Sequence, residues 1–283
     1  MENSNHMNQV EKAESFKLLH EAPGIFAIPN PWDAGTAKLL SQLGFKALAT
    51  TSAGLAFTLG RPDGLSHITR EETLQNARAI VEATQLPVAA DLENGFGDSP
   101  EACAETIKLA AATGLVGGSI EDNSGNSSDP IYSFEQSVER VKAAVAAASE
   151  LPFPFILAAR AENLIYGRID LNDTIRRLQA YADAGADVLF APGLKTIKDI
   201  ETVVKAVAPK PLNVVMGLSG TNFTLHQLED AGVKRVSVGS ALVRAAFGAF
   251  FNAAKEIQEK GSFSFADQAM PYPQLNSFFN KKL

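Results

Sequence analysis

Eight short apolar runs, each followed by a segment of helical character, constrain the fold of this chain more than any other feature. Strands that are buried on both faces have this near-continuous apolar character, and their alternation with helices is typical of a parallel sheet covered by helices. Eight such units within 283 residues predict an α/β fold, a (β/α)8 TIM barrel. The runs lie at residues 24–29, 47–52, 87–93, 116–122, 155–162, 188–193, 211–216 and 235–239.

A doubly wound open sheet is the alternative fold for such a pattern. It would carry a glycine-rich nucleotide-binding fingerprint after the first strand, but the chain reads IPNPWDAG at 28–35. We therefore expect one barrel over residues 16–260. A flexible N-terminal tail is expected at 1–15 and a C-terminal extension at 261–283.

Charge and hydropathy exclude several classes of partner. The net charge of -7 and the pI near 5.2 argue against general nucleic-acid binding, which needs a basic face. Small anionic substrates remain possible, because they need only a few local cations. No apolar run is long enough to span a membrane, and the polar N-terminus lacks the apolar core of a signal peptide. We expect a cytoplasmic protein without a membrane partner.

Acidic residues gather where the third and fourth strands are expected to end. Asp91 and Glu93 are two positions apart, so along a strand their side chains point to the same face. Glu121 and Asp122 are adjacent, so only one of them faces inward. Paired carboxylates repel each other and lose hydration, and a cation, a shared proton or basic partners must offset that cost.

In a barrel the active site lies at the carboxyl ends of the strands, where these acids converge. Converging carboxylates favour a hard divalent cation with oxygen ligands, Mg²⁺ or Mn²⁺. Arg160 at the end of the fifth strand, with the hydroxyl-and-amide turn at 50–56, could hold an anionic substrate beside the metal. The alternative is a purely structural polar layer in which Asp91 and Glu93 pair with Arg160.

Eight short motifs follow one another on successive predicted elements. Together they resemble the isocitrate lyase/phosphoenolpyruvate mutase superfamily over nearly the whole chain. The motifs are NPWDAGTAKLL (30–40), TTSAGLA (50–56), GRPDG (60–64), DLENGFG (91–97), SIED (119–122), ARAE (159–162), PLNVV (211–215) and RVSVGSALVRAA (235–246).

The resemblance implies a modified barrel whose last helix is exchanged with a neighbouring subunit in a homotetramer, a dimer of dimers. The aromatic tail at 262–279 fits such a contact, since it is too apolar to be left in water. The implied function is a Mg²⁺-dependent lyase. Its substrate would be a small 2-oxo or 2-hydroxy carboxylic acid, cleaved or decarboxylated at a C–C bond through an enolate. Phosphorus–carbon bond chemistry, by a mutase or hydrolase, and non-catalytic binding of an oxo acid are the alternatives.

The resemblance also implies roles for single residues. Asp91 resembles the principal metal ligand, with Glu93 and Glu121 acting directly or through waters. Arg160 resembles the residue that stabilises the intermediate, and Asp63 and Glu121 are the other catalytic candidates. The expected substrate-binding residues are Thr51, Ser52, Ala53, Gly54 and Asn213.

Departures from the superfamily pattern bear on the reaction. The second acid of the metal motif is usually Asp, and here it is Glu93. The segment 123–133, where the lyases carry a gating loop with a catalytic Cys, contains no Cys, Lys or His. After the sixth strand Pro192 stands where the lyases have an acid. The proton donor is therefore not identified by resemblance, and water or a hydroxyl such as that of Ser124 is the expectation.

Overall fold

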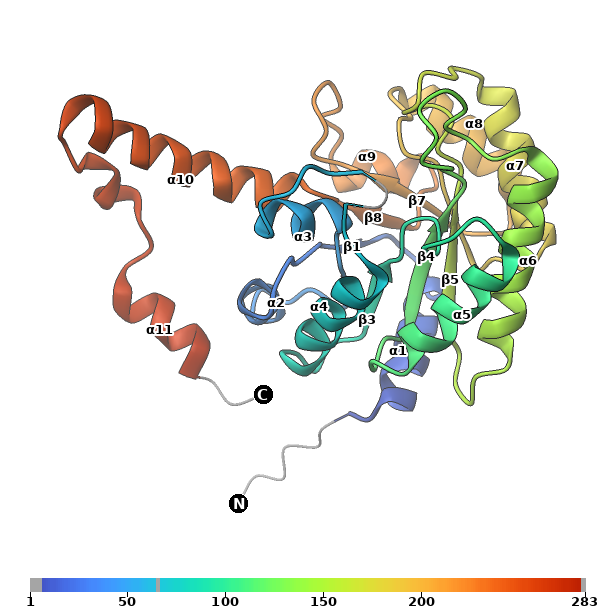
Figure 1. The fold of residues 1–283 in the computed structure, drawn as a ribbon, viewed down its shortest axis with the longest axis horizontal. Helices are drawn as coiled ribbons and strands as arrows, with labels where there is room; N and C mark the ends of the chain where they lie inside the picture. Colours follow the sequence, from blue (N-terminus) through green and yellow to red (C-terminus); the bar gives the residue numbers. More distant parts are fainter. Residues whose placement is uncertain (1–6, 65–66, 281–283) are drawn as a thin grey trace.

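Eight parallel strands form a nearly closed barrel in the computed structural model, which describes residues 7–64 and 67–280 (Figure 1). Their order in the sheet is β1-β8-β7-β6-β5-β4-β3-β2, and every pairing is parallel. The Ala49 amide donates to the Pro29 carbonyl at 3.1 Å, which links the two outermost strands. The predicted TIM-barrel fold is confirmed. The strands are Phe26–Ile28 (β1), Leu48–Ala49 (β2), Val88–Asp91 (β3), Gly117–Glu121 (β4), Ile156–Arg160 (β5), Val188–Phe190 (β6), Leu212–Val215 (β7) and Arg235–Ser237 (β8).

Helices surround the barrel, and most begin at a side chain that caps the first turn. Ser99, for example, accepts a hydrogen bond from the Ala102 amide, and Pro100 follows at the first helical position, where its missing N–H costs nothing. The helices are Gln9–Glu21 (α1), Ala34–Ser41 (α2), Ser52–Thr58 (α3), Arg70–Glu82 (α4), Pro100–Ala111 (α5), Phe134–Ser149 (α6), Leu171–Asp183 (α7), Ile197–Val207 (α8), Leu225–Asp230 (α9), Ala241–Lys260 (α10), Ser264–Gln268 (η1, a 3₁₀ helix) and Tyr272–Asn280 (α11). None of the described helices is long and apolar enough to cross a bilayer.

The N-terminal helix α1 covers the amino ends of the strands. Ala13 and Phe16 of this helix are completely buried. The Phe16 ring approaches the barrel so closely that a Cβ on Gly117 would lie 2.9 Å from it. The predicted tail at 1–15 is therefore wrong for residues 9–15, because they form the first part of a helix whose apolar face packs into the core. Residues 1–6 lie outside the described part of the chain.

After β8 the chain leaves the barrel along α10 (Figure 1). Two aromatic side chains on this helix are largely exposed, Phe250 at 74% and Phe251 at 66%. α11 then contacts α2, where the Gln42 amide donates to the Phe278 carbonyl at 2.7 Å. The segment that projects from the barrel thus begins with α10, earlier in the chain than the predicted residue 261.

Candidate active site

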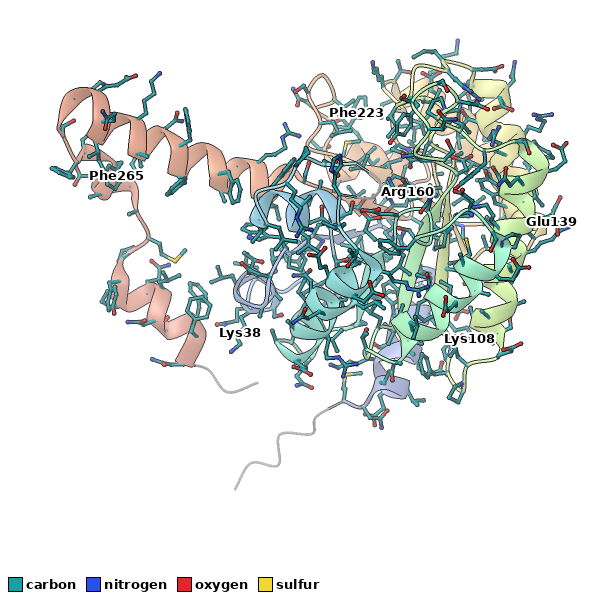
Figure 2. All side chains as sticks on the ribbon, in the orientation of Figure 1. Lys38, Lys108, Glu139, Arg160, Phe223 and Phe265 are labelled. Carbon is teal, nitrogen blue, oxygen red and sulfur yellow. The ribbon has the colours of Figure 1, made fainter. Side chains whose placement is uncertain are left out.

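Arg160 lies at the end of β5 (Figure 2). Three carboxylates surround its guanidinium. Burial alone would lower the pKa of Arg160, but attraction to the acids outweighs it and raises that pKa well above the ordinary value. This guanidinium therefore stays charged and holds the acids of three neighbouring strand ends together. Its partners are Asp91 (Nη1 to Oδ1, 2.9 Å), Glu121 (Nη2 to Oε2, 3.0 Å) and Glu162 (Nε to Oε1, 2.8 Å).

Asp91 ends β3 and is fixed by groups from both sides. Its Oδ2 accepts hydrogen bonds from the Ser52 hydroxyl at 2.7 Å and from the Ser52 amide at 3.2 Å. Its Oδ1 accepts from Arg160 at 2.9 Å and from the Glu93 amide at 3.3 Å. The carboxylate is thereby held in one orientation at the edge of the barrel mouth.

Glu93 lies just beyond β3 in a conformation that costs energy. Its φ of 47° is in the left-handed region, which a residue with a Cβ adopts at a cost. The side chain is buried, and within the described residues its Oε2 has no hydrogen-bond partner. Burial, followed by repulsion from Asp91 and Asp63, raises the pKa of Glu93 to about 8. A buried, strained acid whose oxygen has no hydrogen-bond partner among the described residues is a candidate ligand-binding group.

Glu121 and Asp122 point to opposite faces of β4, as strand alternation predicts. Glu121 faces inward to Arg160. Asp122 faces outward, where its Oδ2 accepts from the Tyr181 hydroxyl at 2.6 Å and from Arg177 at 3.1 Å. Asp122 therefore anchors the surrounding helices and takes no part in the site.

Two small cavities meet at Arg160. We call the first the inner cavity: it has a volume of about 200 Å³ and extends between the strands into the barrel, with Asp91 among its lining residues. The second, the outer cavity, has about 100 Å³ and is lined by Glu93 and Glu121. Ser52, Asp63, Arg160 and Ile165 line both cavities. A ligand at this junction would contact the arginine and the acids together.

The predicted substrate-binding residues are brought to the inner cavity only in part. Thr51, Ser52 and Ala53 line it, whereas Gly54 does not. The segment predicted as a turn is the start of α3, where the Thr51 hydroxyl accepts from the Gly54 amide at 3.2 Å. Gly54 packs tightly, since a Cβ there would lie 2.5 Å from the Thr51 side chain.

Asn213 also lines the inner cavity, but its amide is already engaged. Its Oδ1 accepts from Arg235 Nε at 2.9 Å, and its Nδ2 donates to the Ser237 hydroxyl at 3.0 Å. The side chain is completely buried. Within the described residues, the Asn213 side chain therefore orients Arg235 and has no free amide group to offer a ligand.

Two further residues at the site had no predicted role. Glu162 follows Arg160 by two positions, and this spacing on one strand end was the available signal. Tyr166 comes from the loop after β5 and had no sequence signal. Its hydroxyl accepts from Asn123 Nδ2 at 2.5 Å and lines the outer cavity. Burial, with Glu121 and Glu162 nearby, raises the pKa of Tyr166, so the phenol keeps its proton.

Ser124, the hydroxyl suggested as a proton donor, is not part of the site. It is not among the residues that line either cavity. Its Oγ donates to the Asp129 carbonyl at 2.6 Å and accepts from the Asn126 amide at 3.1 Å. These bonds stabilise a surface turn, so the expectation is corrected in favour of a local structural role.

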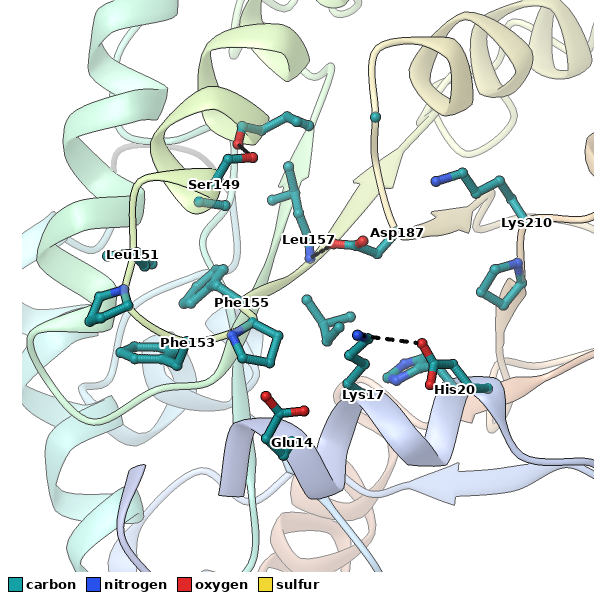
Figure 3. A pocket seen from close by; sticks show the side chains of 18 of the residues that line it. Glu14, Lys17, His20, Ser149, Leu151, Phe153, Phe155, Leu157, Asp187 and Lys210 are labelled. Carbon is teal, nitrogen blue, oxygen red and sulfur yellow. Dashed lines mark hydrogen bonds and ion pairs between the residues drawn. The ribbon is translucent and has the colours of Figure 1, made fainter. Parts of the chain in front are cut away.

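A larger cavity of about 830 Å³ lies at the opposite end of the barrel, beside α1 (Figure 3). Its walls combine proline and phenylalanine side chains with charged ones. Asp187 there accepts from the Leu157 amide at 2.8 Å, and Lys17 lies 3.8 Å from Glu21. These charged groups are engaged with the fold or with each other, and chemistry in TIM barrels belongs to the other end.

The donor set at the barrel mouth can be tested against a divalent cation. Within residues 7–64 and 67–280, no three His, Cys, Asp or Glu side chains form a ready-made set of direct ligands. Mg²⁺ usually keeps several waters and uses only one or two carboxylates. Asp91 on a rigid strand end and the unpartnered Oε2 of Glu93 suit that mode of binding.

Comparison with known proteins agrees with this geometry. The family model described as phosphoenolpyruvate phosphomutase matches residues 16–258. The chain is 30% identical to an uncharacterized protein of Mycobacterium tuberculosis, covering 93% of this chain and 95% of the relative. It is 29% identical to the probable 2-methylisocitrate lyase 1 of Corynebacterium glutamicum, covering 92% and 86%. It is 30% identical to the oxaloacetate decarboxylase of Bradyrhizobium diazoefficiens, covering 74% and 75%.

Solved structures give the same result. A protein of Burkholderia cenocepacia J2315, provisionally described as a lyase/mutase, superposes with a TM-score of 0.94 at 56% identity, covering 96% of this chain and 97% of that one. Oxaloacetate acetylhydrolase in complex with its product oxalate superposes with a TM-score of 0.84 at 26% identity, covering 94% and 93%.

The fold and the site thus define an α/β-barrel enzyme with an acid-rich mouth, and the chain belongs to the phosphoenolpyruvate mutase/isocitrate lyase superfamily. The predicted family is confirmed. The predicted enzyme class, a carbon–carbon lyase, is the class of the named lyase and decarboxylase relatives.

Proposed function

We propose that this chain is a Mg²⁺-dependent lyase that breaks a C–C bond in a small 2-oxo or 2-hydroxy carboxylic acid through an enolate. The observation that carries the proposal is the excess of acid at the cavity junction. Asp91, Glu121 and Glu162 share the single guanidinium of Arg160, and Glu93 is buried beside them with an unpartnered oxygen. Such a cluster is stabilised by a cation and suits a substrate that brings negative charge with that cation.

Asp91 and Glu93 would hold the metal, with Glu121 acting directly or through water, and Mn²⁺ has the same ligand preference. When bound, the metal would polarise the oxo or hydroxy oxygen and lower the cost of the developing negative charge. The carboxylates of Asp91, Glu93 and Glu121 would need little rearrangement for this, because Ser52 and Arg160 already hold Asp91 in place.

Arg160 would stabilise the enolate oxygen from beside the metal ligands Asp91 and Glu121, which it contacts. Its side chain is only 15% exposed, is fixed by three ion pairs and lines both cavities, so its charge is preorganised where negative charge develops. Thr51, Ser52 and Ala53 at the start of α3 line the same cavity and would hold the substrate carboxylate. Asp63 also lines the outer cavity and would place a further carboxylate beside the bound ligand.

Tyr166 is the proton donor that the outer cavity offers. Its hydroxyl keeps its proton because burial and nearby acids oppose ionisation. Asn123 donates to the phenol oxygen and thereby orients the O–H bond. For a 2-oxo acid that loses CO₂, the phenol proton would pass to the enolate carbon left by C–C cleavage, and solvent would reprotonate the phenolate. For a 2-hydroxy acid, the phenol proton would pass to the released carbon, and the proton lost from the substrate hydroxyl would return to the phenolate through solvent.

The relatives define the substrates with which the proposal is tested. Purified wild-type protein and Arg160→Met are assayed with oxaloacetate and 2-methylisocitrate, each with Mg²⁺ or with a chelator. The proposal predicts Mg²⁺-dependent release of CO₂ or of a 2-oxo or carboxylate product from at least one of them, lost in the variant. Phosphonopyruvate is included in the panel, and turnover of this compound alone would replace the proposal by phosphorus–carbon chemistry. Binding without any turnover would indicate an oxo-acid binder.

The projecting C-terminal segment supports an assembly proposal. Phe250 and Phe251 on α10 and Tyr272 on α11 are 66–79% exposed, which is costly for a single copy in water. We propose that α10 and α11 pack on a neighbouring subunit in a homotetramer built as a dimer of dimers. Analytical ultracentrifugation of wild type and Phe250→Glu tests this. A tetramer that dissociates in the variant agrees with the proposal, and a wild-type monomer contradicts it.

A further inference from the structure

A second arginine, Arg235 at the start of β8, lies inside the barrel without an acidic partner in the described part of the chain. Only 6% of the residue is exposed. Its Nε donates to Asn213 Oδ1 at 2.9 Å, and its Nη1 lies 3.4 Å from His20 Nε2. Burial lowers the pKa of Arg235 to about 10. A buried charge with only neutral partners is costly, and proteins normally pair it.

His20, on α1, is itself neutral. Its Nδ1 bonds the Phe16 carbonyl at 2.8 Å and must be the protonated nitrogen there, which leaves Nε2 as an acceptor toward Arg235. Burial and the charge of Arg235 lower the pKa of His20 to about 3. His20 and Asn213 therefore orient the guanidinium but do not offset its charge.

Arg235 is also one of the residues that line the inner cavity. That cavity reaches Asp91, Ser52 and Arg160 at its other end, so the two arginines face one continuous space of about 200 Å³. The lining of this cavity combines larger side chains such as Phe190 with small ones such as Ala49, Ala89 and Ser119. TIM-barrel interiors are usually filled by bulky branched residues. The small residues on one part of the wall leave room for a ligand that extends from the mouth toward Arg235.

A guanidinium has five N–H donors, and its two neutral partners use two of them. The remaining donors suit a planar carboxylate, which accepts two parallel hydrogen bonds from an arginine. A purely structural role would leave the charge unbalanced beside a cavity. An anionic group of the ligand would balance it.

We propose that Arg235, positioned by Asn213, binds a second carboxylate of the substrate and so selects dicarboxylic 2-oxo or 2-hydroxy acids over their monocarboxylic counterparts. The proposal rests on the proposed function, because the first carboxylate and its neighbouring oxygen are placed at the acid-rich mouth. The second carboxylate, which Arg235 would recognise, lies at the end of the ligand that points into the barrel.

The test uses matched ligand pairs that differ only in the second carboxylate. Malate is compared with 2-hydroxybutyrate, and 2-hydroxyglutarate with 2-hydroxypentanoate, so that two lengths are covered. Dissociation constants are measured with Mg²⁺ by calorimetry for wild type, Arg235→Met and Arg78→Met. Arg78 is an exposed arginine of α4 and serves as the matched control. Oxalate, which has no carbon between its two carboxylates, is the probe of the mouth.

We expect wild type and Arg78→Met to prefer the dicarboxylate by about 10- to 100-fold in at least one pair, the range of a charge-assisted hydrogen bond. Arg235→Met should lose that preference while its oxalate affinity stays within about threefold of wild type. Arg235→Lys, which keeps the charge but not the planar fork, should keep part of the preference.

Equal affinities within both pairs in wild type, or an undiminished preference in Arg235→Met, would overturn the proposal. The wild-type comparison decides the matter even if Arg235→Met does not fold. Failure of oxalate to bind wild type with Mg²⁺ is a separate result, which would contradict the proposed function and not the selectivity of Arg235.

Discussion

Arg160 and Arg235 are both arginines with little exposure in the same barrel, and their surroundings are opposite. Arg160 at the mouth contacts three carboxylates, with Glu93 buried close by. Arg235 deeper in the barrel contacts, among the described residues, the neutral groups of Asn213 and His20. The mouth therefore has an excess of acid and the interior an excess of base. The charge at the two ends of the site is therefore unbalanced in opposite directions. The mouth suits a cation, and the interior suits an anionic group of a ligand.

The largest expected effect comes from removing the arginine at the mouth. Arg160→Met should lower turnover on the order of 10²- to 10³-fold, because a preorganised charge at the reacting oxygen is lost. It should also lower the free energy of unfolding of the metal-free protein by about 3–5 kcal/mol, since the buried acids lose their partner. Steady-state kinetics and urea unfolding measure the two effects.

Arg177→Met is the matched control for that variant. Arg177 is also buried and paired with acids, Asp122 and Asp173, but it does not line either cavity. We expect a similar loss of stability with turnover of the folded protein retained. Equal losses of turnover in the two variants would show that Arg160 acts only through the fold.

Tyr166→Phe separates proton transfer from charge stabilisation at the mouth. Removing the phenol hydroxyl should lower the rate of turnover about 10²-fold, the lower part of the range for general acid catalysis. The affinity for oxalate with Mg²⁺ should not change, because the acids and Arg160 remain. Unchanged turnover would assign the proton to solvent.

The pH dependence of stability distinguishes the mouth from the interior. Glu93 has its pKa raised from the ordinary 4.5 to about 8 in the folded protein, so folding takes up a proton between these values. The metal-free protein should therefore lose stability as pH rises from about 4.5 to 8. Glu93→Gln should remove much of that loss, as measured by urea unfolding across this range with a chelator present. A wild-type profile parallel to that of the variant would contradict the raised pKa.

An effect of opposite sign is expected from His20 in the interior. Its pKa is lowered from 6.5 to about 3, so the stability it contributes is present above pH 6.5 and is lost as pH falls toward 3. His20→Gln, which removes the titrating group, should make the stability profile flatter over this acidic range. Thermal unfolding at fixed ionic strength measures how stability depends on pH. Identical slopes for wild type and His20→Gln would refute the assignment.

The sequence allowed the barrel and most of the mouth to be predicted, because both follow from local patterns. Each short apolar run became a strand, and the acids at strand ends met because parallel strands end at one edge. Arg235 and Tyr166 were not predicted. Arg235 begins a strand, and its lack of a partner depends on which residues surround it in three dimensions. Tyr166 reaches the site from a loop whose path no periodicity specifies.

Two further expectations failed for physical reasons that the sequence hides. Residues 9–15 look polar and tail-like, yet Ala13 and Phe16 form one apolar stripe that closes the barrel end. The segment after β2 contains glycine and hydroxyl residues typical of a turn, but Thr51 caps it as a helix. In both cases a few tertiary contacts decide the local structure.

The central claim is that the acids at the mouth form a divalent-cation site for a small oxo acid. Its most direct test is calorimetric titration of oxalate into wild type and Asp91→Ala, each with Mg²⁺ and with a chelator. Oxalate resembles the enolate of a 2-oxo acid and needs no knowledge of the substrate. The account predicts tight oxalate binding by wild type only when Mg²⁺ is present, and at least about tenfold weaker binding by Asp91→Ala. Oxalate binding that is the same with and without Mg²⁺, or the same in both proteins, would contradict it.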